Sequence, residues 1–430
     1  MGFDLKPHQK SIIDGVIRKN INRILFYHEV GTGKTITSLG LAYKYWSQKE
    51  RDLIIVTPVS IMNNFEREMK SIKSLYKQSI KNVTLLTYAK YLKKVDQNSG
   101  FVDNKIVIVD EIHNFRNTGK TTTAMIKSLK NAARVILLSA TPIVNNPMDL
   151  IPILAILNRK KYGEIDISDS SLYADKISYY TLDMSTDKDK FPKVNHFKTD
   201  IYMNMEYYND YIALESEQTP KLPENFQNKD ISAFFNGMRR GVNKIFNRSG
   251  KIDWVIEHIK RNPKRKILVY SAWKDAGLNL IFSELDDKVF KYCIITGDVS
   301  KRQRDSIVKD YNDKTINILG ISSAGSEGLD LKETNDIIIL EPHWNNQKIR
   351  QIIGRGVRYN SHINLPEKER FVNVYLLLLQ KPKDIPILQR AWYFFVDSGN
   401  AAIDQWMLTY ANKKEKENNA YLQKLKDFRI

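Results

Sequence analysis

The chain has 430 residues, which is long enough for two or three domains with well-buried cores. Its hydrophobic fraction of 42% and charged fraction of 27% are typical of a globular protein, whereas its formal net charge of +18 is unusually basic. A surplus of this size favours a polyanionic partner, either nucleic acid or an anionic membrane, with a solvated lysine-rich surface as the alternative. The single cysteine, Cys293, excludes a disulfide within the chain and a cysteine-based zinc cluster.

Membrane insertion and secretion are not expected from this sequence. No apolar run approaches the length of a membrane span, and residues 1–10 lack the apolar core of a signal peptide. We therefore expect a soluble intracellular protein with no membrane partner.

Residues 24–37, ILFYHEVGTGKTIT, combine an apolar run, a glycine turn and a segment compatible with a helix. This order predicts a buried strand, a phosphate-binding loop and a helix that begins near Lys34. Gly31 and Gly33 would let backbone N–H groups approach phosphate oxygens closely. Lys34 would supply a positive charge for the outer phosphates, and Thr35 a hydroxyl for Mg²⁺. The segment departs from G-x-x-x-x-G-K-T at its first position, where His28 replaces glycine, so a chance glycine turn before a core helix is the alternative for this segment alone.

Further strands of the first domain are predicted at residues 52–58, 105–113 and 134–142. Alternation of these apolar runs with helical stretches indicates a parallel sheet, whose chemistry gathers at the carboxyl ends of the strands. The second run ends in Asp110 and Glu111, which could hold Mg²⁺ and orient and deprotonate the attacking water, respectively. The third ends near Ser139 and Thr141. Upstream, an amphipathic helix follows residues 5–9, LKPHQ; the amide of Gln9 could bind adenine, although a glutamine taken alone would be expected at the surface.

The ordered set LKPHQ, HEVGTGKT, IIVTP, VDEIH and LLSATP resembles the first motor domain of superfamily 2 helicases and translocases. In the second half, ITGDVSKRQR, SSAGSEGLDL and PHWNNQKIRQIIGRGVRYNSH resemble the Snf2-like branch. The run RYNSH at residues 358–362 is similar to the poxvirus-type group that contains nucleoside triphosphate phosphohydrolase I and the early transcription factor small subunit. The resemblance covers residues 5–379.

The middle of the chain is expected to connect two motor domains. Residues 158–192 are polar with little periodicity, and we interpret them as a helical excursion and linker, with a nucleic-acid-facing insertion as the alternative. Residues 192–215 predict a strand and a helix rich in tyrosine. Those tyrosines could stack on bases, but aromatic stripes more often pack in a core. The residues concerned are Tyr202, Tyr207, Tyr208 and Tyr211.

The second motor domain is predicted from apolar runs at residues 265–271, 292–295, 316–323 and 337–340. They are followed by a helical segment in which Arg355 and Arg358 lie three residues apart, on one face of the helix. Both could reach a γ-phosphate as arginine fingers. The C-terminal residues 384–430 predict helices that are solvated or bind a partner rather than act in catalysis.

The resemblance implies an α/β fold with two RecA-like parallel-sheet domains in tandem, a helical connector and C-terminal helices. The expected segments are domain 1 at residues 1–157, the connector at 158–245, domain 2 at 246–382 and the extension at 383–430. The resemblance also implies ATP and Mg²⁺ as cofactors. The residues implied in catalysis are Lys34, Asp110, Glu111, Arg355 and Arg358. Those implied in nucleotide binding are Gln9, Gly31, Thr32, Gly33, Lys34, Thr35, Gly328 and Asp330, of which Thr35 and, in addition, Asp110 would bind Mg²⁺. The implied coupling residues are His113, Ser139, Thr141 and Gln351, and the implied nucleic-acid contacts are Thr57, Tyr88, Thr296 and Ser323.

We therefore expect a nucleic-acid-stimulated ATPase that translocates on duplex DNA in viral transcription, with RNA polymerase or other transcription proteins as further partners. Its expected location is the cytoplasm, or the virion or viral factory of a host cell. Two alternatives stay open: a helicase that separates DNA or RNA strands, and an assembly subunit that uses ATP as a binding switch.

Overall fold

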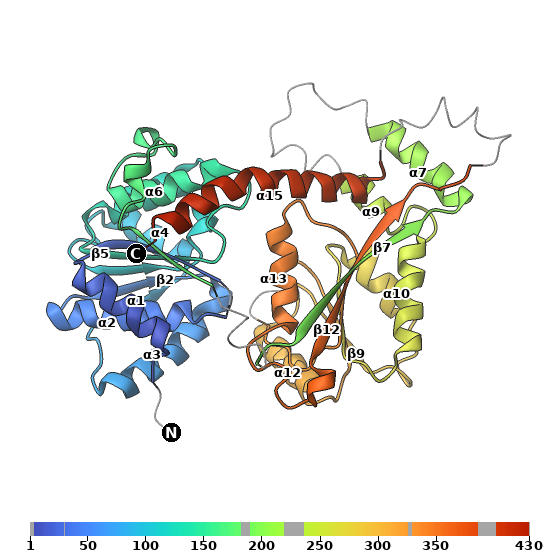
Figure 1. Ribbon diagram of the computed structural model, residues 1–430, viewed down its shortest axis with the longest axis horizontal. Coiled ribbons are helices and arrows are strands. Elements are labelled where there is room, and N and C mark those ends of the chain that lie inside the picture. Colours follow the sequence, from blue (N-terminus) through green and yellow to red (C-terminus); the bar gives the residue numbers. More distant parts are fainter. Residues whose placement is uncertain are drawn as a thin grey trace. The chain divides into compact units, whose positions relative to one another are not determined.

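The computed structural model describes residues 4–29, 31–181, 190–218, 236–325, 329–385 and 401–429. The chain divides into two compact units (Figure 1). Unit 1 comprises Met1–Asp183 and Lys414–Ile430, and unit 2 comprises Met184–Lys413. The predicted division into four segments is not tested by these units and stays a prediction.

Unit 1 is built on a six-stranded sheet in the order β3-β2-β4-β5-β1-β6. Every neighbouring pair is parallel, so the carboxyl ends of the strands share one edge. The four central strands are buried, as expected for apolar runs covered on both faces. The strands are β1 (Arg23–His28), β2 (Leu53–Val56), β3 (Val83–Leu86), β4 (Ile106–Val109), β5 (Arg134–Ser139) and β6 (Ile177–Tyr180).

Helices cover both faces of this sheet (Figure 1). One apolar core joins the sheet to α1 (Pro7–Arg18), α2 (Lys34–Gln48) and α3 (Met62–Tyr76). A second core lies on the other face, against α4 (Tyr88–Gln97), α5 (Lys120–Ser128) and α6 (Leu150–Asn158). The sheet is therefore closed off from solvent on both sides, which leaves its edge of strand ends for chemistry.

The interpretation of residues 158–192 as a helical excursion is wrong where it meets β6. The strand Ile177–Tyr180 pairs with β1 in the sheet of unit 1. This strand could not be predicted from the sequence because an edge strand needs few apolar residues, and ISYY offers one aliphatic side chain. The strand at the opposite edge, β3, was missed too, since its first residue, Val83, is exposed.

Unit 2 repeats the architecture with a second parallel sheet, in the order β7-β12-β11-β8-β10-β9. Its longest strands pair over ten residues, from Phe371↔Lys193 to Gln380↔Tyr202. The strands are β7 (Lys193–Tyr202), β8 (Ile267–Tyr270), β9 (Tyr292–Ile295), β10 (Ile318–Ile321), β11 (Asp336–Ile339) and β12 (Phe371–Gln380). Two parallel-sheet domains confirm the predicted α/β fold class.

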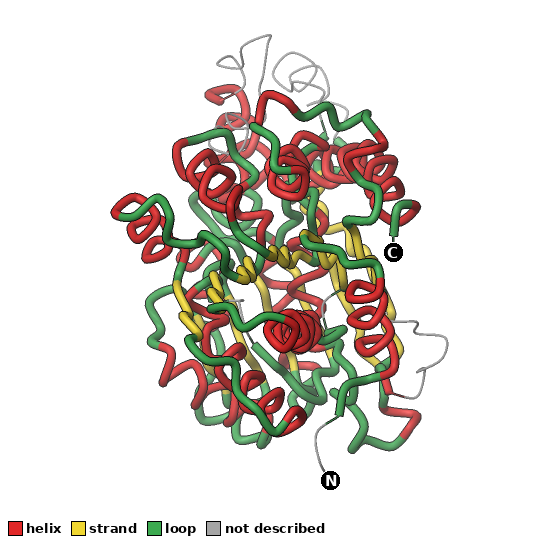
Figure 2. The backbone as a smooth tube through the Cα atoms, turned by 90° about the vertical axis from the view of Figure 1, so that its left-hand side faces the viewer, coloured by secondary structure: helices red, strands yellow, loops and turns green. Residues whose placement is uncertain are grey.

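Two apolar cores pack helices against the second sheet; Figure 2 traces the backbone with helices in red and strands in yellow. One core contains α10 (Gly250–Arg261) and α11 (Asn279–Phe282). The other contains α12 (Lys301–Asn312) and α13 (Asn346–Gly356). A third core joins α7 (Met205–Gln218), α9 (Asn236–Gly241) and the start of α15 (Ile403–Asp427).

The last helix, α15, is not a solvated appendage. Its first turns belong to unit 2, where Met407 is buried with Tyr211. From Lys414 on it belongs to unit 1, where Leu425 is fully buried against the core that contains α6. The C-terminal helix is therefore part of the packed structure of each unit, and the predicted solvated character is wrong for these faces.

The tyrosines of the middle segment divide by burial. Tyr207, Tyr208 and Tyr211 are buried in the third core of unit 2, which confirms the core interpretation for them. Tyr202 is exposed, with Lys383 Nζ 4.6 Å above its ring centroid.

Among the described residues, no helix is both long enough and apolar enough to cross a membrane.

Candidate nucleotide-binding and catalytic site

The phosphate-binding loop connects β1 to α2 in unit 1. Gly31 and Gly33 have φ of +85° and +82°, in the left-handed region that favours glycine. A Cβ atom on Gly33 would clash with the amide nitrogen of Gln9, so this glycine also permits a close approach. Lys34 starts α2, and its Nζ donates to the carbonyl oxygens of His28 (2.8 Å) and Glu29 (3.1 Å). The lysine therefore lies over the loop that the sequence predicts to bind phosphate.

Side chains in the first turn of α1 contact the backbone of this loop. Gln9 is buried, contrary to the surface position expected of it alone. Its Nε2 donates to the carbonyl of Thr32 (3.4 Å), and its Oε1 accepts from the backbone N–H of Lys6 (2.9 Å). His8 Nε2 lies 3.1 Å from the same Thr32 oxygen. Two consecutive side chains thus bond to one loop carbonyl.

Two carboxylates follow β4 at the carboxyl edge of the sheet. Asp110 is buried, and its carboxylate accepts from Thr57 Oγ1 (3.3 Å) and from the backbone N–H of Glu111 (3.0 Å). Burial, followed by the Glu111 charge, raises the pKa of Asp110 to about 7, although the Lys34 charge opposes both. Burial likewise lowers the pKa of Lys34, while Glu111, Asp110 and Glu29 act in the opposite direction. Lysine and both carboxylates therefore interact in one poorly solvated site.

Glu111 adopts a backbone conformation that a non-glycine residue rarely has, with φ +47° and ψ +51°. Such a conformation costs about 1–3 kcal/mol and is common at functional sites. Its carboxylate lies 3.2 Å from His113 Nδ1. The same nitrogen lies 3.0 Å from Ser139 Oγ and 3.5 Å from Thr141 Oγ1, and the backbone N–H of Thr141 donates to Ser139 Oγ (3.0 Å). Three predicted coupling residues thus meet beside the predicted base.

Two residues predicted on the nucleic-acid track touch the same carboxylate segment. Thr57, fully buried, donates to Asp110 as described above. The hydroxyl of Tyr88 donates to the backbone carbonyls of Asp110 (2.6 Å) and Glu111 (3.3 Å). Both side chains therefore contact the segment that carries the two carboxylates.

The residues predicted to bind Mg²⁺ offer a hydroxyl and a carboxylate. Thr35 lies in the first turn of α2, directly after Lys34, and Asp110 is one of the carboxylates that interact with Lys34. These hard oxygen donors fit Mg²⁺, which usually takes few protein ligands and completes its shell with water and phosphate. Within the described residues, no group of three or more His, Cys, Asp and Glu side chains could hold a metal ion by itself.

The two arginines of unit 2 do not share a helix face. Arg355 lies in α13, which ends at Gly356, and Val357 is extended (φ −106°, ψ 93°), so the prediction of one helical face is wrong. Arg358 instead folds back beyond the helix end: its Nε donates to the carbonyl of Gly354 (2.9 Å), and its Nη1 lies 3.3 Å from Asp330 Oδ1. The helix stops early because the backbone turns after a glycine, which the spacing R-x-x-R did not reveal.

Of the remaining predicted residues of unit 2, two lie just after strand ends. Thr296 follows β9 and Ser323 follows β10, where Lys348 Nζ donates to the Ser323 carbonyl (3.3 Å). Gln351 lies in α13 and is partly buried. Gly328 lies outside the described residues.

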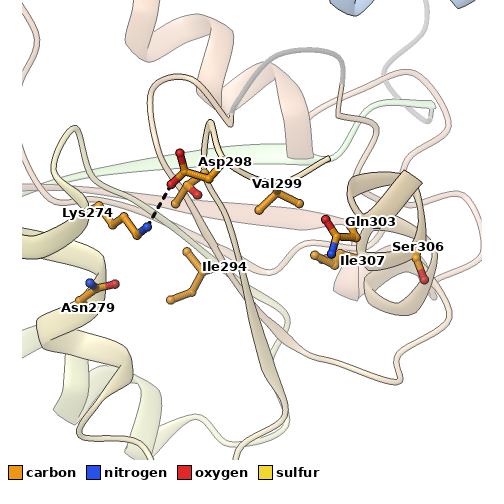
Figure 3. A pocket seen from close by; sticks show the side chains of 9 residues that line it. Lys274, Asn279, Ile294, Asp298, Val299, Gln303, Ser306 and Ile307 are labelled. Carbon is orange, nitrogen blue, oxygen red and sulfur yellow. Dashed lines mark hydrogen bonds and ion pairs between the residues drawn. The ribbon is translucent and has the colours of Figure 1, made fainter. Parts of the chain in front are cut away.

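An open pocket of about 560 Å³ lies beside Thr296 (Figure 3). Side chains from the β9 end, α12 and the segment around α11 line it, among them Ile294, Gln303 and Asn279. Lys274 and Asp298 form an ion pair at 3.0 Å on one side of it. Its polar groups are thus partly engaged with one another.

Three side chains near the phosphate loop were not predicted to act there. His8 contacts Thr32, and its ring stacks on Tyr180 with centroids 4.1 Å apart and planes at 7°. Ser178 lies 2.8 Å from the ring of His28. Ser178 and Tyr180 belong to β6, and because this strand was not predicted, their position beside the loop was not predicted either. The signal in the sequence that could have pointed to them is His28, which stands where the loop pattern has glycine.

Two family models match the chain. The model described as type III restriction enzyme, res subunit, matches residues 2–144, which contain the phosphate loop and the carboxylates. The model described as helicase conserved C-terminal domain matches residues 250–360, which contain both arginines.

Relatives span nearly the whole chain. It is 30% identical to the putative ATP-dependent RNA helicase L538 of Acanthamoeba polyphaga mimivirus, over 97% of this chain and 96% of that protein. The chain belongs to the superfamily 2 helicases. It is 24% identical to the termination factor NPH-I homolog of African swine fever virus, isolate Tick/Malawi/Lil 20-1/1983, over 84% of this chain and 70% of that protein. The predicted relation to the poxvirus-type group is thereby confirmed.

Among solved structures, the chain is similar to the SWI2/SNF2 ATPase core of Sulfolobus solfataricus in complex with double-stranded DNA. The TM-score is 0.39 and the identity 20%, over 97% of each chain. As a superfamily 2 member the protein is a nucleotide-using, helicase-family ATPase, and its family binds nucleic acid.

Proposed function

We propose that this protein is a nucleic-acid-stimulated ATPase that translocates on duplex DNA during viral transcription. The observation that carries the proposal is the cluster of Lys34, Asp110 and Glu111, whose charges act on one another at the carboxyl edge of the unit 1 sheet. A lysine at a glycine loop and two carboxylates are the groups that phosphoryl transfer to water requires.

The nucleotide is ATP, bound with Mg²⁺. Backbone N–H groups around Gly31, Thr32 and Gly33 bind the phosphates, Lys34 adds a positive charge, and Gln9 lies at the adenine. Thr35 and Asp110 would hold Mg²⁺, which would neutralise charge on the phosphate oxygens. Glu111 accepts the proton of the attacking water, because its carboxylate lies next to the Asp110–Lys34 site and is held by His113 at 3.2 Å.

Arg355 and Arg358 of the second motor domain act on the γ-phosphate, with Gly328 and Asp330 near the nucleotide and Gln351 in coupling. The ion pair of Arg358 with Asp330 can be broken at little cost. The Asp330 side chain is 59% exposed, and ion pairs of this kind contribute about 0–1 kcal/mol. The arginine is therefore available for a stronger ligand.

Nucleic acid is bound mainly through its phosphates. The net charge of +18 supports this, as do the strand-end positions of Thr296 and Ser323. With Thr57 and Tyr88 at the catalytic carboxylates, the track would couple strand binding to hydrolysis. The choice of duplex DNA follows the Snf2-like resemblance, and the role in transcription follows the relatives named as NPH-I homologues.

The proposed segments are motor domains at residues 1–157 and 246–382, a connector at 158–245 and an extension at 383–430, except that β6 belongs to the sheet of unit 1 and β7 to the sheet of unit 2. By analogy with its viral relatives, the protein acts in the cytoplasm of an infected host cell or in the virion, with RNA polymerase or another transcription protein as its partner.

The test is the ATPase rate of the pure chain without nucleic acid and with single-stranded DNA, duplex DNA and RNA. We expect duplex DNA to raise the rate most, and a Lys34→Ala variant to lose ATP binding. Equal rates in all four conditions would contradict the motor. Stimulation without directional transport on duplex DNA would favour an ATP-driven binding switch, and strand separation would favour a true helicase.

A further inference from the structure

The phosphate loop departs from its usual sequence at His28, and the backbone explains why glycine is not needed there. His28 is the last residue of β1, in extended conformation, and the left-handed glycines of the loop are Gly31 and Gly33. A side chain at position 28 therefore causes no backbone strain. What remains to be explained is why that side chain is an imidazole.

The ring of His28 packs against two residues of β6. It is 1% exposed, and its Nε2 lies 2.8 Å from Oγ of Ser178, which is also buried. It stacks on Phe26, with centroids 4.8 Å apart and planes at 7°, and meets Tyr180 edge-on at 6.0 Å. A buried hydrogen bond and two ring contacts fix the end of β1 more firmly than a glycine could.

The backbone around His28 links this anchor to the loop. The N–H of Glu29 donates to the carbonyl of Tyr180 (3.0 Å), which extends the β1–β6 pairing into the loop. The carbonyls of His28 and Glu29 accept from Lys34, and the carbonyl of Glu29 also accepts from Thr32 Oγ1 (2.7 Å). The position of these carbonyls thus sets the position of the lysine and of the loop.

We infer that His28 is a positioning residue for ATP binding, which holds the phosphate loop through its contact with Ser178 of β6 in place of the missing glycine. This inference rests on the proposed function. Its sharpest consequence is that His28→Gly, which restores the usual motif, weakens ATP binding. The substitution removes the ring, leaves the Ser178 hydroxyl buried without its partner and adds backbone freedom to the loop.

The burial of the ring agrees with this role. Burial lowers the pKa of His28 to about 3, with the Lys34 and His8 charges acting in the same direction. The imidazole therefore stays neutral at physiological pH and adds no charge beside the phosphates.

The experiment measures the affinity of the full chain for the fluorescent analogue mant-ATP, without nucleic acid, beside thermal unfolding. We expect His28→Gly to raise Kd by more than about tenfold, and Ser178→Ala, which removes one atom, by about threefold to tenfold. The double variant should exceed His28→Gly by less than the effect of Ser178→Ala alone, because both remove one interaction. The matched control is Ser128→Ala: Ser128 is likewise buried, and its Oγ lies 2.8 Å from the hydroxyl of Tyr91, away from the loop.

If Ser178→Ala and Ser128→Ala lose stability alike and only Ser178→Ala loses affinity, the inference holds. If His28→Gly and Ser178→Ala both bind mant-ATP as the wild type does, the histidine is an ordinary core residue and the inference is wrong. Tighter binding by His28→Gly would overturn it as well. A wild-type chain that binds no mant-ATP would instead refute the proposed function, so the two failures are distinguishable.

Discussion

The two units bury charged side chains near the strand ends of similar sheets, but they neutralise these charges differently. In unit 2, Lys251 Nζ lies 2.7 Å from Asp404 Oδ2, and both side chains are at most 1% exposed. The same oxygen accepts from the backbone N–H of Leu379 (2.9 Å). Nearby, buried Glu341 accepts from Ser271 Oγ (2.7 Å) and the N–H of Ala272 (3.0 Å).

In unit 1 the charges outnumber their partners. Asp110 and Glu111 are adjacent and share the influence of Lys34, and burial together with the Glu111 charge raises the pKa of Asp110 to about 7. Glu111 also holds a strained backbone. Paired charges, as in unit 2, stabilise one structure, whereas crowded carboxylates make a site that gains free energy when a cation and a phosphate arrive. The contrast separates a structural cluster from a candidate catalytic one.

The largest effect should follow Glu111→Gln. Turnover should fall by up to about ten-thousandfold, because the amide keeps the shape of the side chain but accepts no proton. ATP affinity and the free energy of unfolding should stay near wild type, since the change removes a charge from a crowded site. Glu50→Gln, at an exposed position two residues after the end of α2, is the control. Lost ATP affinity with preserved hydrolysis would contradict the role of Glu111.

Arg358→Ala should come next. Stimulated turnover should fall by at least about a thousandfold, or about 4 kcal/mol of transition-state stabilisation, while ATP binding stays nearly normal. Arg355→Ala should behave alike, and the double variant should cost much less than the sum, because both serve one transition state. Basal and stimulated ATPase rates would be measured beside DNA affinity. Wild-type turnover in Arg358→Ala would disprove its action on the nucleotide.

The structural side of the comparison is tested by Lys251→Met. Removing the cation leaves Asp404 buried without its ion-pair partner, and the free energy of unfolding should fall by about 3 kcal/mol. Lys10→Met is the matched control: its ion pair with Asp4 is nearly as short, 2.8 Å, but exposed, so the expected loss is much smaller. Urea unfolding measures both. Equal losses would mean that the buried pair contributes no more than a surface pair.

Tyr88→Phe should have the smallest effect. It removes the hydroxyl that donates to the carbonyl of Asp110, which costs about 1 kcal/mol, or about fivefold, in stimulated turnover. Tyr91→Phe makes the same change on the same helix, at a buried hydroxyl bonded to Ser128, and should lower stability instead. If both variants behave alike in ATPase assays, Tyr88 does not act on the carboxylate segment.

The sequence by itself determined the fold class and the order of the nucleotide-binding motifs. Apolar runs such as residues 106–109 are buried on both faces, so their hydrophobicity alone predicts a central parallel strand. The glycines of the loop were equally readable, because Gly31 and Gly33 adopt the left-handed backbone conformation that their residue type favours. Local chemistry sufficed wherever a residue's role depended on its own neighbours.

Tertiary structure decided what depends on partners distant in sequence. The edge strand β6 has too little apolar content to be recognised alone, yet its pairing with β1 brings Ser178 to His28 across 150 residues. The burial of Gln9 follows from its bond to Thr32, and the end of α13 before Arg358 follows from an extended Val357 that the spacing of the arginines did not reveal. A motif specifies which groups are present, whereas packing decides which of them meet, because burial and hydrogen bonding are properties of the folded chain.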